Sequence, residues 1–96
     1  MKNVKLSKEF LNEIACNEEL TKKDYRVFLY LLTKLDDKEY EQISQRNICA
    51  ELYMDKSSVS KSINNLLEQG VISRDFFQRN HFKFGDGFGI PSLLDN

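Results

Sequence analysis

The sequence is poor in several residue types, and each scarcity excludes something. Its 96 residues include no Trp, one Pro, one His and two Cys, with a formal net charge of −1. One His and two Cys make no cluster at metal-ligand spacing, so we expect no metal and no cofactor. The small net charge argues against indiscriminate binding to nucleic acid.

Long apolar runs are missing as well. None approaches the roughly 18 residues of a membrane-spanning helix, and the N-terminus MKNVKLSKEF has no signal-peptide core. We therefore expect a cytoplasmic protein without a membrane partner, in which Cys16 and Cys49 are reduced and packed. The length suits one domain with one modest core.

The sequence also lacks the residues of an enzyme. It has no assignable activated nucleophile, no glycine-rich phosphate loop ahead of a helix and no carboxylate pair in an apolar setting. Gly85-Asp-Gly-Phe-Gly89 superficially resembles a dinucleotide fingerprint, but it opens no predicted helix. We expect no catalytic residues.

The charge that is present is unevenly distributed. Residues 56–83 hold five basic side chains and two acidic ones, a net charge of +3, whereas the rest holds nine basic and thirteen acidic ones, a net charge of −4. This segregation indicates either a face that meets a polyanion or a chance distribution in a short chain.

The first half of the chain predicts helices. Residues 1–19 predict an arm or short strand followed by a short helix capped by Ser7. Thr21 and Asp24 form a capping-box pattern that opens a core helix. Its apolar stripe is Tyr25, Phe28, Leu29, Leu32 and Leu35, widened by Val27, Tyr30 and Leu31.

The second half predicts two more helices and a hairpin. A short strand over 40–43 precedes a helix capped by Ser44, and Asp55 caps another helix, which ends at Gly70 in the C′ position. Its inner face is Val59, Ile63, Leu66 and Leu67. After Gly70 the apolar period becomes two, which predicts strands over 71–77 and 81–84. We expect Phe76, Phe77, Phe82 and Phe84 to be core rather than a base-stacking platform, and residues 85–96 to be an irregular tail.

Three motifs carry a family resemblance. They are Ile43-Ser-Gln-Arg-Asn-Ile48, Asp55-Lys-Ser-Ser-Val-Ser60 and Leu66-Leu-Glu-Gln-Gly-Val-Ile72. In this order of elements they resemble the winged helix-turn-helix of MarR-like regulators and of small bacterial plasmid proteins that act in replication or conjugative transfer. The resemblance covers residues 20–84 and implies a mainly α fold with a small β-hairpin wing that binds DNA.

The helix after Asp55 would then be the recognition helix. Small side chains at its leading end suit entry into a major groove about 12 Å wide, where hydroxyls and free amides can bind phosphates. The residues that we predict opposite its buried stripe are Lys56, Ser57, Ser58, Ser60, Lys61, Asn64 and Asn65. The alternative is a merely solvated helix face.

Two further groups extend this predicted interface. Arg79 at the hairpin tip suits a narrow, A·T-rich minor groove, and Arg74, His81 and Lys83 would flank it on phosphates. Gln45 and Arg46 would anchor the DNA backbone from the preceding helix. Each of these side chains is alternatively an ordinary exposed residue.

The resulting hypothesis is a sequence-specific double-stranded-DNA-binding protein, an accessory protein of a plasmid or mobile element that recognises an origin region. Ten Lys against four Arg, with eight Asn, indicate an A·T-rich genome. MarR-like regulators carry further helices at both ends, so we expect no effector domain here, and a homodimer, cooperative binding or a larger DNA-processing partner. The alternatives are a small MarR-like transcriptional repressor and a winged-helix adaptor that binds protein instead of DNA.

Overall fold

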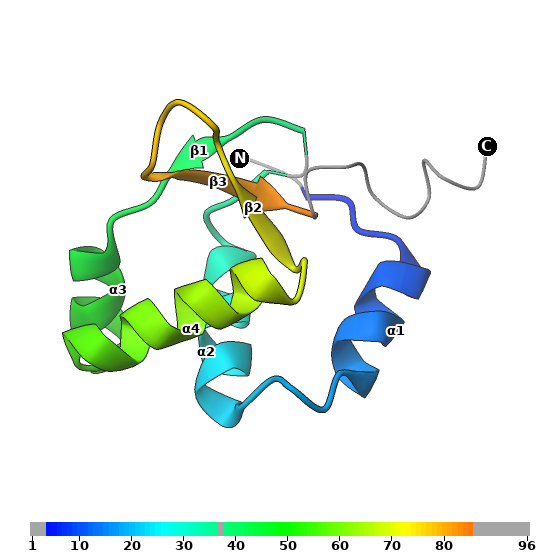
Figure 1. The fold of residues 1–96 in the computed structure, drawn as a ribbon, viewed down its shortest axis with the longest axis horizontal. Coiled ribbons are helices and arrows are strands. Elements are labelled where there is room, and N and C mark those ends of the chain that lie inside the picture. The colour runs from blue at the N-terminus through cyan, green and yellow to red at the C-terminus, as the bar shows by residue number, and fades with distance from the viewer. Residues whose placement is uncertain (1–3, 37, 86–96) are drawn as a thin grey trace.

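The computed structural model describes residues 4–36 and 38–85, which form helices packed under a small sheet (Figure 1). In chain order the elements are α1 (Lys8–Cys16), α2 (Lys22–Leu31), β1 (Glu41–Gln42), α3 (Gln45–Leu52), α4 (Lys56–Glu68), β2 (Ile72–Arg74) and β3 (His81–Phe84). This confirms the predicted mainly α fold with a β-hairpin wing. Residues 86–96, predicted to be an irregular tail, lie outside the described residues.

The sheet is antiparallel with strand order β1-β3-β2. Ile72 lies opposite Phe84 and Arg74 opposite Phe82 on β2 and β3. The β3 strand has the predicted bounds, but β2 ends at Arg74 instead of residue 77. Its last ladder bond is donated by the Asp75 N–H to the His81 carbonyl at 2.8 Å, beyond which the chain leaves the sheet.

The core lies where α2, α3 and α4 meet the inner face of this sheet. Phe28 of α2 and Phe84 of β3 pack edge to face with ring centroids 5.7 Å apart. The buried residues at this centre are Val27, Phe28, Leu31, Ile48, Val59, Ile63, Leu66, Ile72, Phe82 and Phe84. Core side chains at helical spacing in α4 and at alternate positions in β3 are the arrangement that the sequence predicted.

Four residues predicted to be packed are exposed, and the Cys16 thiol is one of them. Leu29 is 60% exposed because α2 buries only the face that carries Val27, Phe28 and Leu31. Phe76 and Phe77 are 89% and 86% exposed because they follow the end of the β2 ladder. The alternation of strand residues holds only while a strand is paired, so it could not place these two rings.

Helix ends follow local chemistry. The capping box of α2 is confirmed: the Asp24 N–H donates to the Thr21 hydroxyl, and the Thr21 N–H donates to the Asp24 carboxylate. Gly70 has φ of 74°, as a residue after a helix often requires. Tyr53, which ends α3, has φ of 55°, and this left-handed residue sets the tight turn into α4.

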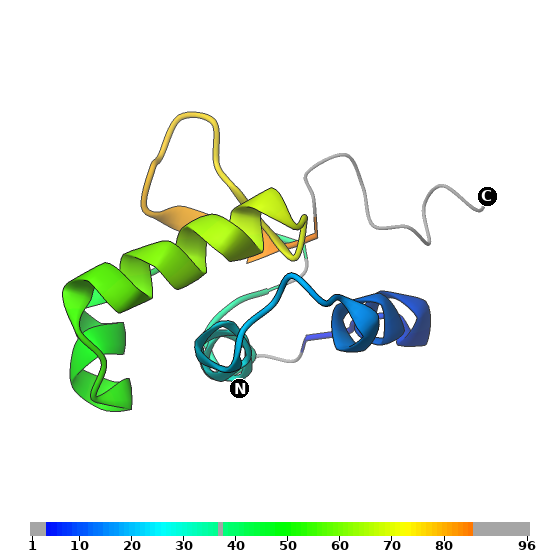
Figure 2. The same cartoon turned by 60° about the horizontal axis from the view of Figure 1, so that its bottom comes forward.

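The first helix, α1, lies at the opposite end of the molecule from α3 in both views (Figures 1 and 2). Ser7 caps it by accepting from the Phe10 N–H at 3.0 Å, as predicted. Phe10 and Ile14 are buried, and the Tyr25 hydroxyl donates to the Ile14 carbonyl at 2.8 Å. Residues 4–6 precede α1 without forming a strand.

Candidate nucleic-acid interface

Helix α4 divides into three faces, of which one is buried. Val59, Ile63 and Leu66 point into the core, and Ser62 lies among them at 2% exposure. Burial of this stripe fixes how the remaining residues of α4 are presented. The serines of α4 lie on all three faces: Ser62 in the core, Ser57 on the outward face and Ser58 toward α2.

The face opposite the core carries Ser57, Lys61 and Asn64, all exposed. Together with Lys56 and the half-buried Ser60 they line one shallow depression. Five of the seven predicted recognition-helix residues are thus brought together on a surface of hydroxyl, amide and ammonium groups. Such groups can bond base edges and phosphates.

The third face of α4 turns toward α2, and it holds the other two predicted residues. The Ser58 hydroxyl accepts from the Lys23 ammonium at 3.1 Å. The Asn65 amide nitrogen donates to the Glu19 carbonyl at 2.8 Å and to the Asp24 carboxylate at 2.6 Å. The prediction that Ser58 and Asn65 lie opposite the buried stripe is wrong, because α2 packs against this side of the helix.

Buried Asp24 is the centre of this contact between α2 and α4. Burial by itself would raise the pKa of its carboxyl, but bonds from the Thr21 N–H, the Asn65 amide and the Ser62 and Thr21 hydroxyls lower the pKa below the usual 3.8. The carboxylate stays charged and holds α4 to the start of α2. Ser62 and Asn65 thereby position the helix.

Two lysines that the sequence analysis did not single out lie beside α4 at this point. Lys22 and Lys23 open α2, and they line a depression with Ser58 and Lys61 of α4. The capping-box pattern located the start of α2 correctly. It gave no sign that this helix start lies beside α4, because that proximity depends on how the two helices cross.

The N-terminus of α4 has an unusual cap. Asp55 has the extended backbone of an N-cap residue, but its side chain makes no capping bond. Instead its carboxylate accepts from the Ser57 hydroxyl at 2.8 Å, and bonds from Ser58 and Ser57 lower its pKa. The first-turn amides of α4 thus lack the bond that an N-cap side chain would supply.

The start of α3 lies next to the start of α4. Half-buried Gln45 and exposed Arg46 line a depression with Cys49 and Lys56. The predicted backbone-anchoring residues are therefore continuous with the recognition helix. The Ser44 hydroxyl caps α3 by accepting from the Asn47 N–H, as expected.

The basic side chains of the wing do not share one face. Arg79 is exposed at the tip, as predicted. Arg74 lies over the ring of Phe82 at 5.3 Å, on the inner face of the sheet. His81 and Lys83 alternate with the buried phenylalanines and occupy the outer face, where the Lys83 ammonium lies 4.8 Å from the Tyr40 ring centroid. Arg74 lies on one face of the sheet, whereas His81 and Lys83 lie on the other. These three side chains therefore cannot form a single row of phosphate contacts along the wing.

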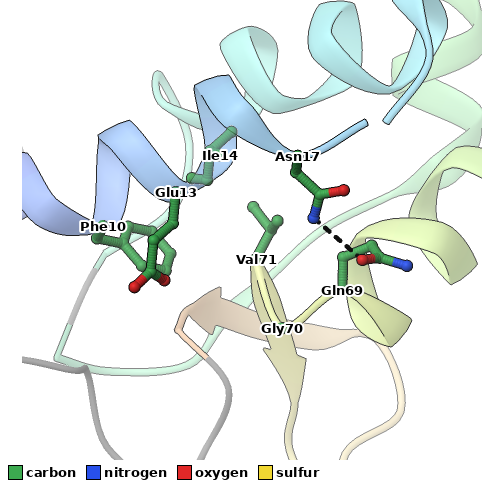
Figure 3. A pocket seen from close by; sticks show the side chains of 7 residues that line it. All are labelled: Phe10, Glu13, Ile14, Asn17, Gln69, Gly70 and Val71. Atoms are coloured by element: carbon green, nitrogen blue, oxygen red, sulfur yellow. Dashed lines mark hydrogen bonds between the residues drawn. The ribbon is translucent and has the colours of Figure 1, made fainter. Parts of the chain in front are cut away.

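A separate cavity lies between α1 and the end of α4 (Figure 3). Phe10, Ile14 and Val71 form its apolar wall, and the Asn17 amide donates to the Gln69 side chain across it at 3.0 Å. Its volume of about 130 Å³ is well below the roughly 300–1,000 Å³ of sites for drug-sized ligands. We interpret it as a packing gap where α1 contacts the end of α4 and the start of β2.

Within the described residues, the carboxylates of Asp36, Glu39 and Glu41 lie within 4.8 Å of one another. Their side chains are half-buried or exposed. Surface carboxylates often gather in this way without an ion, so this group does not define a metal site. Among the same residues, no helix has the length and apolarity to cross a membrane.

Helices α3 and α4 joined by a tight turn, followed by an antiparallel hairpin, define a winged helix-turn-helix protein. The model of the MarR family matches residues 19–76, from the start of α2 into the wing. The chain belongs to the MarR family, whose members are DNA-binding regulators. Comparison with curated proteins and with solved structures gave no significant match.

Proposed function

We propose that the protein binds a specific sequence of double-stranded DNA, with the outward face of α4 in the major groove and Arg79 of the wing in an adjacent minor groove. The observation that carries the proposal is the exposed cluster of Ser57, Lys61 and Asn64, which no core or inter-helix contact explains. Lysine can bond guanine or phosphate, and asparagine can bond adenine at two positions.

The neighbouring cations supply the backbone contacts of the proposed complex. Arg46 and Lys56 lie at one end of the α4 face, and Lys22 and Lys23 border it along α2. Phosphate contacts of this kind fix orientation without reading sequence. These cations come from three helices, α2, α3 and α4. Their distribution supports a binding mode in which the duplex lies across all three helices.

The biological role that we propose is an accessory protein of a plasmid or mobile element, which recognises an origin region for transfer or replication. The Lys- and Asn-rich composition, typical of an A·T-rich genome, supports it. A transcriptional repressor is the second candidate, supported by membership of the MarR family. A single module buries only roughly 600–1,000 Å² on DNA, so we propose that it binds as a homodimer or cooperatively at repeated sites.

Selection from a random duplex library at moderate salt tests the proposal. An enriched motif is expected, and two copies at fixed spacing would indicate a dimer. A motif that occurs in origins supports the accessory role, whereas one confined to promoters supports the repressor. Absence of both enrichment and salt-sensitive retention would overturn DNA binding and favour a protein-binding adaptor.

Alanine variants test which element, α4 or the wing, contacts which part of the DNA. Lys61→Ala should flatten the preference for the selected motif, with a loss of about 1–3 kcal/mol of discrimination if Lys61 contacts a base. Arg79→Ala should weaken binding only to duplexes with A·T-rich flanks. Lys8→Ala, which removes a cation from exposed α1, is the matched control and should leave both properties unchanged.

A further inference from the structure

The loop that joins β2 to β3 presents two adjacent phenylalanines to solvent. Phe76 is 89% exposed and Phe77 is 86% exposed. Their ring centroids are 5.0 Å apart and the ring planes are nearly perpendicular, so each ring packs against the other. Two large rings outside the core are unfavourable in water and mark a surface with a binding role.

Hydrogen bonds at its base and tip define the turn of this loop. The Asp75 N–H donates to the His81 carbonyl at 2.8 Å, and the Asp75 carboxylate accepts from the Phe77 N–H at 3.4 Å. The His81 N–H donates to the Gln78 carbonyl at 3.0 Å, which closes the tip. The two rings thus project from a defined turn.

The position of the loop relates these rings to the α4 face. In Figure 2 the loop rises above α4 on the side that faces away from α2. Gln78, Arg79 and Asn80 follow the rings directly and are also exposed. The tip therefore combines an apolar pair with a cation and two amides.

We propose that Phe76 and Phe77 form a wedge that enters the minor groove beside Arg79, unstacks a base step and bends the DNA. This inference rests on the proposed function and adds a second mode of recognition to it. Apolar side chains inserted between base steps of the minor groove kink the duplex toward the major groove. Pyrimidine–purine steps unstack most easily, so the wedge would select a flexible step that Arg79 flanks.

Charge favours DNA over a second copy of the chain as the occupant. In a two-fold pairing of wings, the same patch would face itself and bring two Arg79 guanidinium groups together. DNA instead offers phosphates to Arg79 and base faces to the rings.

The test compares the intact protein with the double variant Phe76→Ala/Phe77→Ala on the duplex that the library selects. The bend is measured by energy transfer between dyes at the duplex ends, and unstacking by fluorescence of 2-aminopurine placed in the flanking step. The intact protein should bend this duplex by more than about 20° and raise the fluorescence. The double variant should lose both effects and bind about tenfold more weakly.

Two controls separate the wedge from a general loss of structure. Phe76→Leu/Phe77→Leu keeps apolar bulk and should keep most of the bend. Leu29→Ala removes another exposed apolar side chain, on α2, and should change neither readout. Thermal unfolding of each variant should match that of the intact protein because the replaced side chains are exposed.

The outcomes distinguish the two proposals. If the intact protein binds no duplex at any salt concentration, the proposed function fails and the wedge with it. If it binds in a salt-dependent manner but the alanine variant bends and unstacks the duplex equally well, only the wedge is overturned. A changed sedimentation mass of the alanine variant with an unchanged bend would overturn it too, and would assign the rings to contact between copies.

Discussion

Asn64 and Asn65 are neighbours in the sequence, but their side chains lie in different environments. Asn64 is exposed on the outward face of α4. Asn65 lies one position further around the helix, where its amide holds the Asp24 carboxylate and the Glu19 carbonyl. Of two identical side chains, one therefore faces solvent and the other holds α4 to the segment before α2 and to α2 itself.

Alanine at each position should show this separation. Asn65→Ala is expected to lower the free energy of unfolding by about 1–3 kcal/mol, because it leaves a buried carboxylate short of a donor. Asn64→Ala should leave stability within about 0.5 kcal/mol and reduce discrimination of the selected DNA motif. Urea unfolding and competition binding measure the two effects, and equal effects of both variants on stability would contradict the assignment.

Asp24 should make stability depend on pH. Because its pKa is lowered in the folded protein from the usual 3.8, the unfolded chain binds the proton more readily. Its contribution is present in full above about pH 4 and is lost as pH falls through the folded pKa. We expect Asp24→Asn to lose about 1.5–3 kcal/mol at pH 7 and to show less dependence on pH in acid.

Urea unfolding at pH 7, 5 and 3 would measure this difference. Glu18→Gln, which neutralises an exposed carboxylate in the same region, serves as the control and should follow the intact protein. Parallel curves for Asp24→Asn and the intact protein would show that Asp24 does not carry the acid sensitivity.

At the scale of elements, the turn between α3 and α4 determines the direction of α4 relative to α3. Tyr53 is 95% exposed and has φ of 55°, a conformation unfavourable for residues with a Cβ. The Leu52 carbonyl just before it accepts from the Arg26 guanidinium at 2.7 Å, which ties the turn to α2. The backbone of this turn is thus held by contacts made elsewhere.

Glycine should suit this position better than alanine. Both Tyr53→Gly and Tyr53→Ala remove an exposed ring, but only glycine accepts the left-handed conformation without a steric penalty. We expect the glycine variant to be more stable than the alanine variant by about 1 kcal/mol. Chemical denaturation measures the difference, and a more stable alanine variant would argue against the left-handed turn.

Elements also show why the wing was only partly predictable. Alternation placed Phe82 and Phe84 in the core correctly because β3 is paired on both sides. The same alternation continued to Phe77 in the sequence, although β2 loses its partner after Arg74. Where pairing ends is decided between strands, so the pattern within one strand could not reveal it.

At the scale of the whole molecule, the net charge is only −1, but the positive and negative side chains are unevenly distributed. Lys22, Lys23, Lys56 and Lys61 border one surface of α2 and α4. Helix α1 instead exposes the acidic side chains Glu9 and Glu13. Association with DNA should therefore be oriented and sensitive to salt.

Salt titration should identify the cations that contact phosphate. The logarithm of the binding constant is expected to fall linearly with the logarithm of salt concentration. Lys23→Ala should reduce the slope by about one, because Lys23 lies on the bordered surface, whereas Lys8→Ala should leave it unchanged. A slope near zero for the intact protein would contradict phosphate binding altogether.

The sequence by itself determined the helices, the side-chain caps of α1, α2 and α3 and the side of α4 that is buried, because capping and helical periodicity act over a few neighbouring residues. It also determined the exposed trio Ser57, Lys61 and Asn64 once that buried stripe was known. Only the tertiary structure decided that Asn65 and Ser58 contact α2, that Lys22 and Lys23 lie beside α4, and that Phe76 and Phe77 stand outside the core. Those outcomes depend on which helices and strands pack against each other. Patterns within a few neighbouring residues carry no information about contacts between segments that are far apart in the sequence.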